Sequence, residues 1–362
     1  MHKRWKAIHR FLWRGMSFRE HICLWLLVAF IAFCSVGCMS DPGVWESSPP
    51  DVSATENTDA EESPTITDTP ESEAAPEPEA ETEPEISSIM NVMVFNAGKA
   101  DAILITTDNS AVLIDTGEAQ HGDQITDYLL NCGITEIDYL IITHFHKDHV
   151  GGADTIIKNL TVKDVIVPNY GKQSKQYEQF AAAMEEAGLE SGVLTETIEF
   201  TLDGVNFTVY PSWQEYYYFG DSSADDDTDE DDYEDTDETS EENVPKENNF
   251  SLAVSVNHGN NNFLFAGDAK AKRLKELLLT GGIVNTQYDF LKVPHHGRYN
   301  KRSEDFIYAI APQYAVITCS LDYPADERVV AALEEVGAEV FFTTNGNVSC
   351  ESDGERLTMM YR

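Results

Sequence analysis

The sequence gathers residue types that ligate metals in one stretch, Thr143-His144-Phe145-His146-Lys147-Asp148-His149-Val150-Gly151-Gly152. Just before it, residues 137–142 read as a buried strand because they are mostly apolar and β-branched. Side chains alternate along an extended chain, so His144 and His146 should point to one side and bind one cation. Asp148 and His149 fall in the turn beyond and can reach a second. A single histidine here would be an ordinary surface residue, but four ligand-type side chains at this spacing favour a metal site at the rim of a sheet.

The chain begins with a basic segment followed by an apolar run over residues 22–36. This run is shorter than the roughly 20 apolar residues that a membrane-spanning helix needs. A charged start, a short apolar centre and small residues before a cysteine are typical of a secretory signal. Residues 1–38 are therefore interpreted as a signal peptide with a lipobox, in which Cys38 is lipidated. The alternative is an uncleaved membrane anchor, and both place the folded domain outside the cytoplasm, on the membrane surface.

Two acidic segments are expected to stay outside the folded core. Residues 39–88 are mostly Glu, Ser, Thr and Pro, and residues 220–247 hold 15 acidic residues and one lysine. Such compositions cannot bury enough apolar surface to fold, so we expect a disordered linker and a disordered surface insertion. A calcium-binding role for 220–247 is the weaker alternative. The formal net charge of −40 argues against indiscriminate nucleic-acid binding, which requires a basic surface.

Residues 89–362 read as one folded domain of mixed strands and helices. Strand-rich blocks in both halves, each followed by helices, predict two packed sheets with helices outside. Asp203-Gly204 and Asp353-Gly354 predict hairpin turns. The predicted domain holds three cysteines, Cys132, Cys319 and Cys350, so no full disulfide framework is expected. We predict that they serve as small residues of the core.

Two further motifs place ligand-type residues where strands should end. Gly267-Asp268 follows an expected strand, although an aspartate there could equally cap the next helix. His295-His296-Gly297 follows another, and adjacent side chains diverge, so one histidine should bind metal and the other face substrate. His258 is expected in the far turn of the 251–266 hairpin, roughly 20 Å from Asp268 at about 3.3 Å per residue. Asn248 and Asn249 lie at the same hairpin end as Asp268.

The first motif resembles the metallo-β-lactamase superfamily, whose αβ/βα sandwich carries its site at one edge of two sheets. Several motifs are similar to the C-terminal hydrolase domain of ComEC-type DNA-uptake proteins, and they run from about residue 90 to 360: Phe95-Asn-Ala-Gly-Lys-Ala-Asp101-Ala, Asn248-Asn-Phe-Ser251-Leu, Gly267-Asp268, Val293-Pro-His-His-Gly297 and Thr318-Cys-Ser320. The chain departs from that pattern at Gly98-Lys-Ala-Asp101, where the family has Gly-Gln-Gly-Asp, and at Arg298, where it has serine. The transmembrane channel of those proteins has no counterpart here, so the resemblance speaks for hydrolase chemistry and not for DNA import.

The resemblance implies two divalent cations, zinc with manganese as the alternative, and a metal-bound hydroxide as nucleophile. It assigns one cation to His144, His146 and Asp268, and the other to Asp148, His149, Asp268 and His296. His295 becomes the substrate-side group and, with Asp148, a predicted catalytic residue. Asp115 is either a partner of a ligand imidazole or a turn aspartate. Asn248 and Asn249 are predicted beside the ligands, at the place where most superfamily members have another histidine.

The substrate is less clearly encoded than the metal site. Arg298, Lys301 and Arg302 directly follow the His-His loop and are predicted to bind a phosphodiester, although a solvated helix face is the plain alternative. We expect a phosphodiesterase or nuclease, with DNA as one candidate substrate. An envelope hydrolase acting on teichoic-acid-type polymers and a non-catalytic binding lipoprotein remain alternatives. No protein partner can be inferred.

Overall fold

The structure is a computed structural model, and it describes residues 89–219 and 246–362. The expected signal peptide, Cys38, the linker 39–88 and residues 220–245 of the insertion lie outside the described residues. Within the described part of the chain, no helix is long and apolar enough to cross a membrane.

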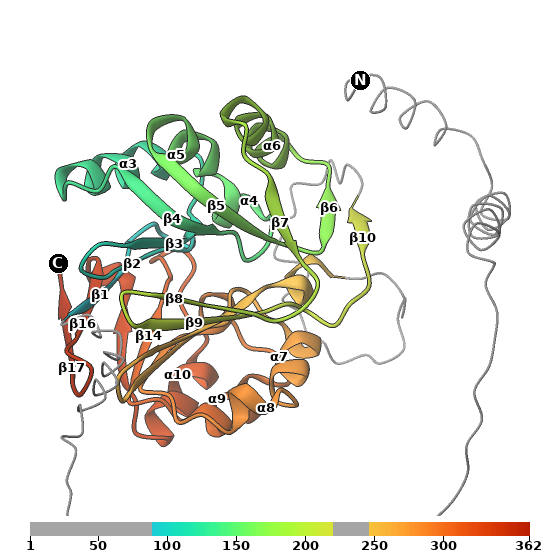
Figure 1. The fold of residues 1–362 in the computed structure, drawn as a ribbon. Helices are drawn as coiled ribbons and strands as arrows, with labels where there is room; N and C mark the ends of the chain where they lie inside the picture. Colours follow the sequence, from blue (N-terminus) through green and yellow to red (C-terminus); the bar gives the residue numbers. More distant parts are fainter. Residues whose placement is uncertain (1–88, 220–245) are drawn as a thin grey trace, which may run out of the picture. The chain divides into compact units, whose positions relative to one another are not determined.

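The first sheet has eight strands, with β3, β4, β5 and β7 running parallel at one side and antiparallel strands at the other. Helices α3 (His121–Asn131), α5 (Ala153–Asn159) and α6 (Lys175–Ala187) cover its outer face (Figure 1). In spatial order the strands are β17 (Leu357–Tyr361), β16 (Val348–Ser352), β1 (Met90–Val94), β2 (Ala102–Thr106), β3 (Ala111–Thr116), β4 (Glu136–Ile141), β5 (Thr161–Pro168) and β7 (Ser191–Leu194).

The second sheet has seven strands, of which β12 to β15 run parallel. Its order is β15 (Glu339–Phe342), β14 (Tyr314–Ile317), β13 (Phe290–Lys292), β12 (Asn261–Phe265), β11 (Ala253–His258), β9 (Val205–Tyr210) and β8 (Ile198–Leu202). Helices α7 (Ala271–Leu277), α8 (Gly281–Val284), α9 (Ser303–Ile310) and α10 (Glu327–Glu335) lie on its outer side (Figure 1). A separate pair, β6 (Tyr170–Lys172) and β10 (Tyr217–Phe219), forms a small parallel sheet.

Three apolar clusters hold the layers together and confirm the four-layer αβ/βα sandwich. The central cluster joins the facing sides of the two sheets, with Val92 and Ile114 from one and Phe207 and Phe265 from the other. The outer clusters join each sheet to its helices. Burying one such side chain stabilises the fold by about 1.5–3 kcal/mol. Alternation along each strand is what supplies apolar side chains to both faces.

Local signals were read correctly at several element ends. Asp203-Gly204 and Gly354 have positive φ in the two predicted hairpins, and the Ser174 side chain caps α6 as Gly188 ends it in the left-handed region. The small β6–β10 sheet and the four-residue helix α4 (Lys147–Val150) were not predicted. Cys319 and Cys350 are buried as expected, but the prediction for Cys132 is wrong because that residue is exposed.

Candidate metal centre

The predicted site residues converge where the parallel strands of both sheets end. Asp115 lies at the end of β3, the stretch 144–149 follows β4, Asp268 follows β12 and His296 follows β13. The backbone N–H of Leu252 donates to the carbonyl of Thr143 (3.0 Å), which fixes the two sheets together beside the site. Ligand sites form at the carboxyl ends of parallel strands because the connecting loops there meet at one edge.

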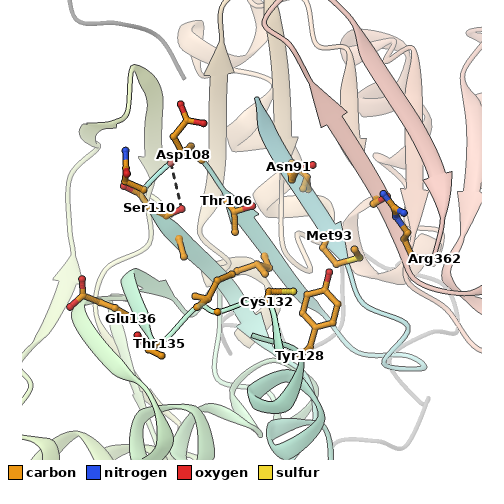
Figure 2. A pocket seen from close by; sticks show the side chains of 18 residues that line it. Asn91, Met93, Thr106, Asp108, Ser110, Tyr128, Cys132, Thr135, Glu136 and Arg362 are labelled. Atoms are coloured by element: carbon orange, nitrogen blue, oxygen red, sulfur yellow. Dashed lines mark hydrogen bonds between the residues drawn. The ribbon is translucent and has the colours of Figure 1, made fainter. Parts of the chain in front are cut away.

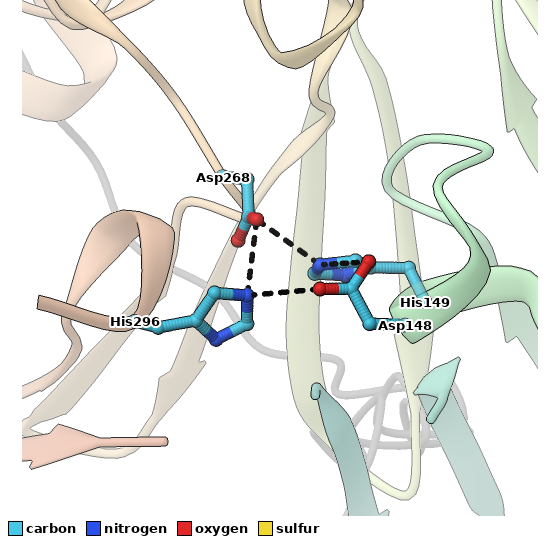
Figure 3. A group of neighbouring side chains, drawn as sticks. All are labelled: Asp148, His149, Asp268 and His296. Atoms are coloured by element: carbon cyan, nitrogen blue, oxygen red, sulfur yellow. Dashed lines mark ion pairs between the residues drawn. The ribbon is translucent and has the colours of Figure 1, made fainter. Parts of the chain in front are cut away.

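Four of the predicted ligands form one compact group: Asp148, His149, Asp268 and His296 (Figure 3). Asp268 Oδ2 lies 3.2 Å from His149 Nε2 and 3.1 Å from His296 Nε2. Asp148 approaches from the other side, with Oδ2 3.5 Å from His296 Nε2 and Oδ1 3.9 Å from His149 Nε2. Two imidazoles and two carboxylates are a donor set that suits zinc, and also manganese.

The hydrogen bonding of this group fits a bound cation. Three of its buried atoms, His149 Nε2, His296 Nε2 and Asp268 Oδ1, have no hydrogen-bond partner among the described residues. Buried polar atoms in native proteins nearly always have a partner, so orphaned ones call for an explanation such as an ion. The other nitrogens are occupied, since His149 Nδ1 faces Asp115 Oδ2 (2.8 Å) and His296 Nδ1 faces Thr318 Oγ1 (3.1 Å). Each ring therefore turns Nε2 into the site.

Protonation in the cation-free protein follows from these contacts. Burial opposes the charged form of His296, but Asp268 and Asp101 overcome it and raise the pKa to about 9. The pKa of His149 lies well above its usual value for the same reason, with Asp268 and Asp115 as the main opposing charges. In the metal-free protein, the protons on His149 and His296 therefore supply the positive charge that a bound cation would supply. Burial together with His149 holds the pKa of His144 well below its usual value, which leaves that ring neutral.

The stability of the metal-free protein should therefore fall as the pH rises above neutrality. A histidine whose folded pKa is raised stabilises the fold fully below its unfolded pKa, 6.5, and loses that contribution as pH rises through the folded value, about 9 for His296. We expect the thermal midpoint of the chelated protein to fall between pH 6.5 and 9. Differential scanning calorimetry in EDTA measures it, and a midpoint that rises over this interval would contradict the assignment.

His144 and His146 lie next to this group, with His144 Nε2 3.9 Å from Asp268 Oδ2 and 3.0 Å from His146 Nδ1. The Nε2 atom of His146 faces away, 3.2 Å from Glu247 Oε2. Glu247 also accepts hydrogen bonds from Tyr170 Oη and Lys172 Nζ, both at 2.7 Å. Carboxylates that contact the outer nitrogen of a histidine fix its orientation. Glu247 thus turns His146 Nδ1 toward His144.

Glu247 corrects the predicted boundary of the acidic insertion, which placed it in a disordered segment. It is 8% exposed and begins η2 (Glu247–Phe250). Burial opposes its ionisation, yet His146 and Lys172 lower the pKa of its carboxyl to about 2. Composition alone could not separate Glu247 from the acidic run before it, because only the tertiary contacts give it a partner.

Glu247→Ala is expected to weaken metal binding by about 10–100-fold, the usual loss when a carboxylate behind a ligand histidine is removed. Competition against a chelating dye measures the affinity. Glu276→Ala is the matched control, since Glu276 forms a buried pair with Arg273 (3.1 Å) in α7 and contacts no imidazole. The control should lose stability but keep its metal affinity. Equal affinities in both variants would mean that Glu247 does not orient His146.

Asp115 contacts the imidazole of His149, a predicted ligand. It has a left-handed φ of 57°, and its carboxylate accepts from the backbone N–H of Thr143 (2.8 Å) as well as facing His149 Nδ1. Burial raises its pKa, against the lowering effect of His149. His295 and His296 also have left-handed φ values, of 50° and 55°. These strained turns aim the side chains of the two loops into the site.

Asp101, Lys292 and Thr318 form a buried unit behind His296 that sequence reasoning did not assign to the site. Asp101 and Lys292 form an ion pair in which neither side chain is exposed. Thr318 Oγ1 donates to Asp101 Oδ1 (2.6 Å), and that oxygen lies 3.5 Å from His296 Nδ1. Lys292 Nζ is also 3.8 Å from Asp268 Oδ1. The sequence offered one indication of this role, namely that the three residues lie within or next to the motifs shared with the ComEC-type pattern.

Gly151 and Gly152 form a turn that leads into α5, and they also permit close packing here. Their φ values, −61° and −89°, suit any residue. A Cβ on Gly151 would lie 2.2 Å from the carbonyl oxygen of Lys147, and one on Gly152 would lie 2.5 Å from that of Thr116. The glycines therefore let α4, which carries Asp148 and His149, lie against the end of β3.

The alternative role for Asp268, as a helix cap, is excluded. The residue preceding α7 is Lys270, whose side chain makes no capping hydrogen bond, and Asp268 stands two residues before it. Asn249 caps α7 instead, because its Oδ1 accepts a hydrogen bond from the backbone N–H of Arg273 (3.1 Å) in the first turn of that helix. Asn248 and Asn249 are buried in η2, beside Glu247, and the cation group described above does not include them. His258 lies at the far end of the β11–β12 hairpin, against Ser352 (2.8 Å).

The predicted substrate-binding residues are divided by the structure. Arg298 is half-buried and its guanidinium lies over the ring of Tyr323, with 5.7 Å to the centroid. Arg302 forms a surface ion pair with Asp305 (2.7 Å) at the start of α9, which supports the plainer reading of a solvated helix face for that residue. Lys301 is exposed.

A cavity of about 750 Å³ opens at the opposite end of the first sheet (Figure 2). Its wall includes Ala111 and Glu136, the first residues of β3 and β4, together with Tyr128, the exposed Cys132 and Arg362. Because β3 and β4 run from this cavity toward the metal ligands, it lies a strand's length from them. It has no part in the chemistry proposed below.

Comparison with known proteins gives a consistent assignment. Residues 96–320 match the metallo-beta-lactamase superfamily, which is more than half of the chain. ComE operon protein 3 of Bacillus subtilis is 26% identical over 73% of this chain and 33% of its own length. Recombination protein 2 of Haemophilus influenzae is 26% identical over 63% of this chain and 24% of its own length. Competence protein ComA of Neisseria gonorrhoeae is 27% identical over 62% of this chain and 26% of its own length. The chain thus spans about a quarter to a third of these ComEC-type relatives.

Proposed function

Because the chain belongs to the metallo-beta-lactamase superfamily, a family of hydrolases, we propose that it is a metal-dependent phosphodiesterase that cleaves nucleic acid. The observation that carries this proposal is the buried group of Asp148, His149, Asp268 and His296, with orphaned nitrogen and oxygen atoms turned inward. The names of two matched relatives point to competence and recombination, and so to DNA as the first substrate to test.

The residues of this chain would hold two divalent cations, one through Asp148, His149, Asp268 and His296 and one through His144, His146 and Asp268. When bound, such cations supply Lewis acidity to a phosphoryl group and lower the pKa of a water. Asp115 fixes His149, the Asp101–Thr318 pair fixes His296 and Glu247 fixes His146. Ligands held in this way need little reorganisation when substrate binds.

His295 is the side chain best placed to handle a proton on the substrate side. Burial holds its pKa well below the usual value, so the ring is neutral at pH 7. A neutral imidazole has one nitrogen that donates and one that accepts. The ring lies 6.1 Å from that of His296, centroid to centroid, and is 8% exposed. It can therefore donate a hydrogen bond to a phosphoryl oxygen without competing for the cations.

Hydrolysis of bis-p-nitrophenyl phosphate by metal-loaded protein tests the enzyme activity, and digestion of single-stranded and double-stranded DNA tests the substrate class. We expect turnover of both kinds of substrate, abolished by EDTA and restored by zinc or manganese. Hydrolysis of a glycerophosphate polymer without DNA digestion would favour the envelope-polymer alternative. Metal binding with no hydrolysis at all would mean a binding lipoprotein.

The same proposal places the enzyme outside the cytoplasm, held to the membrane by lipid on Cys38. Its support is the sequence alone: a basic start, the apolar run 22–36 and small residues before the cysteine. Cys38→Ala should release the protein from the membrane fraction or leave a longer precursor. An unchanged size and membrane partition would reject the anchor.

A further inference from the structure

Two of the three positions at which the chain departs from the ComEC-type pattern meet at one aromatic ring. Lys99 stands where that pattern has glutamine, and Arg298 stands where it has serine. Lys99 Nζ lies 5.2 Å from the centroid of the Tyr323 ring, and Arg298 Cζ lies 5.7 Å from it. A cation near an aromatic face gains about 0.5–1 kcal/mol at an exposed site, but two cations sharing one ring repel each other.

Both cations stand close in the chain to residues of the metal centre. Lys99 precedes Asp101 by two residues and Arg298 follows His296 by two, and Asp101 Oδ1 is 3.5 Å from His296 Nδ1. Lys99 is also within electrostatic reach of His295. Burial is the main cause of the low pKa of His295, and the charges of Lys270 and Lys99 add to it against the opposing effect of Asp268.

A hollow beside the ring gives room for a ligand. It has a volume of about 610 Å³ and is lined by Arg298, Tyr299, Tyr323 and the segment 324–328, within the usual range for ligand pockets. Its acidic wall is partly neutralised, because Asp326 accepts from the Arg328 guanidinium at 2.8 and 3.0 Å. Asp322 and Glu327 also line it, so the positive charge in this hollow that is not paired with Asp326 comes from Arg298.

We propose that Lys99 and Arg298 form a subsite for a second phosphate of a nucleic-acid strand, next to the phosphodiester that reacts. This inference rests on the proposed function, whose substrate it specifies. Guanidinium and ammonium groups bind phosphate through charge-assisted hydrogen bonds. Tyr323 is 42% exposed, so its ring can stack against a nucleic-acid base. A glycerophosphate polymer has no base and could not make this contact.

Equilibrium binding tests the subsite without activity. Isothermal titration of the full chain with thymidine 3′,5′-bisphosphate in EDTA excludes any contribution from divalent cations. The double variant K99Q/R298S restores the family's residues and should weaken binding by about tenfold, the loss of about 1.4 kcal/mol of charge-assisted contact. The matched control is K158Q/R356S, which removes the same charges at exposed sites in α5 and in the β16–β17 hairpin. An unchanged dissociation constant in K99Q/R298S would overturn the subsite.

Kinetics separate failure of the subsite from failure of the proposed function. The p-nitrophenyl ester of thymidine 3′-phosphate is compared with the same ester carrying a 5′-phosphate. K99Q/R298S should lose about tenfold more in kcat/KM for the 5′-phosphorylated ester than for the ester that lacks this phosphate. If the unaltered protein cleaves none of these, the proposed function fails and the titration alone decides the subsite. Glycerol 1,3-bisphosphate binding as tightly as the nucleotide would overturn the assignment to nucleic acid.

Discussion

Asp268→Asn is expected to abolish metal binding and hydrolysis together. Asp268 Oδ2 is the atom that both His149 Nε2 and His296 Nε2 approach, at 3.2 and 3.1 Å. Its Oδ1 is buried and has no hydrogen-bond partner in the part of the chain that the structure describes. Asparagine keeps the shape but removes the charge that two cations would share. Loss of groups that merely orient a ligand costs 10–100-fold, so losing the shared ligand itself should cost at least about hundredfold in metal affinity and in rate.

Elemental analysis and the rate on bis-p-nitrophenyl phosphate measure this outcome, with the thermal midpoint lowered through lost metal binding. Asp289→Asn is the matched control. Asp289 lies in the same sheet at the opposite strand end, where its Oδ2 accepts from the backbone N–H of Asn262 (2.9 Å). That variant should retain metal and activity. Two bound metals and a near-normal rate in Asp268→Asn would reject the binuclear centre.

Lys292→Met should destabilise the protein by about 3–5 kcal/mol, the usual cost of leaving one member of a buried ion pair without its partner. Asp101 and Lys292 are both 0% exposed, and Lys292 also lies 3.8 Å from Asp268. Burial disfavours the lysine charge, but Asp101 and Asp268 outweigh it and raise the Lys292 pKa. Removing the ammonium takes away the lysine charge that both carboxylates approach.

Urea unfolding in EDTA measures this loss without a contribution from metal. The double variant Asp101→Asn/Lys292→Met should recover part of it, because no buried charge is then left unpaired. Lys163→Met is the control for an exposed lysine, since Lys163 pairs with Glu136 and Asp138 at the surface, and little change is expected there. If Lys292→Met is as mild as this control, the pair does not hold the two halves of the site together.

The sequence alone predicted much of the strand and helix pattern and the residues that come together in the candidate metal group. The buried run 137–142 followed by the H-x-H-x-D-H spacing placed ligands at a strand end, and β4 (Glu136–Ile141) ends just before them. The Asp-Gly hairpins were also readable. These features depend on near neighbours in the chain, because alternation, turn conformation and helix capping are set within a few residues.

Tertiary structure alone decided which charges stand behind those ligands. Asp101 meets Lys292 across 191 residues and Thr318 across 217, and Glu247 meets Lys172 across 75. Lys99 and Arg298 likewise come together only at Tyr323. A local pattern shows that a residue is polar and near a strand end, but its partner depends on how the two sheets pack. The first-motif histidines could therefore be read from the sequence, whereas the carboxylates, ammonium and hydroxyl that orient them appear only in the folded protein.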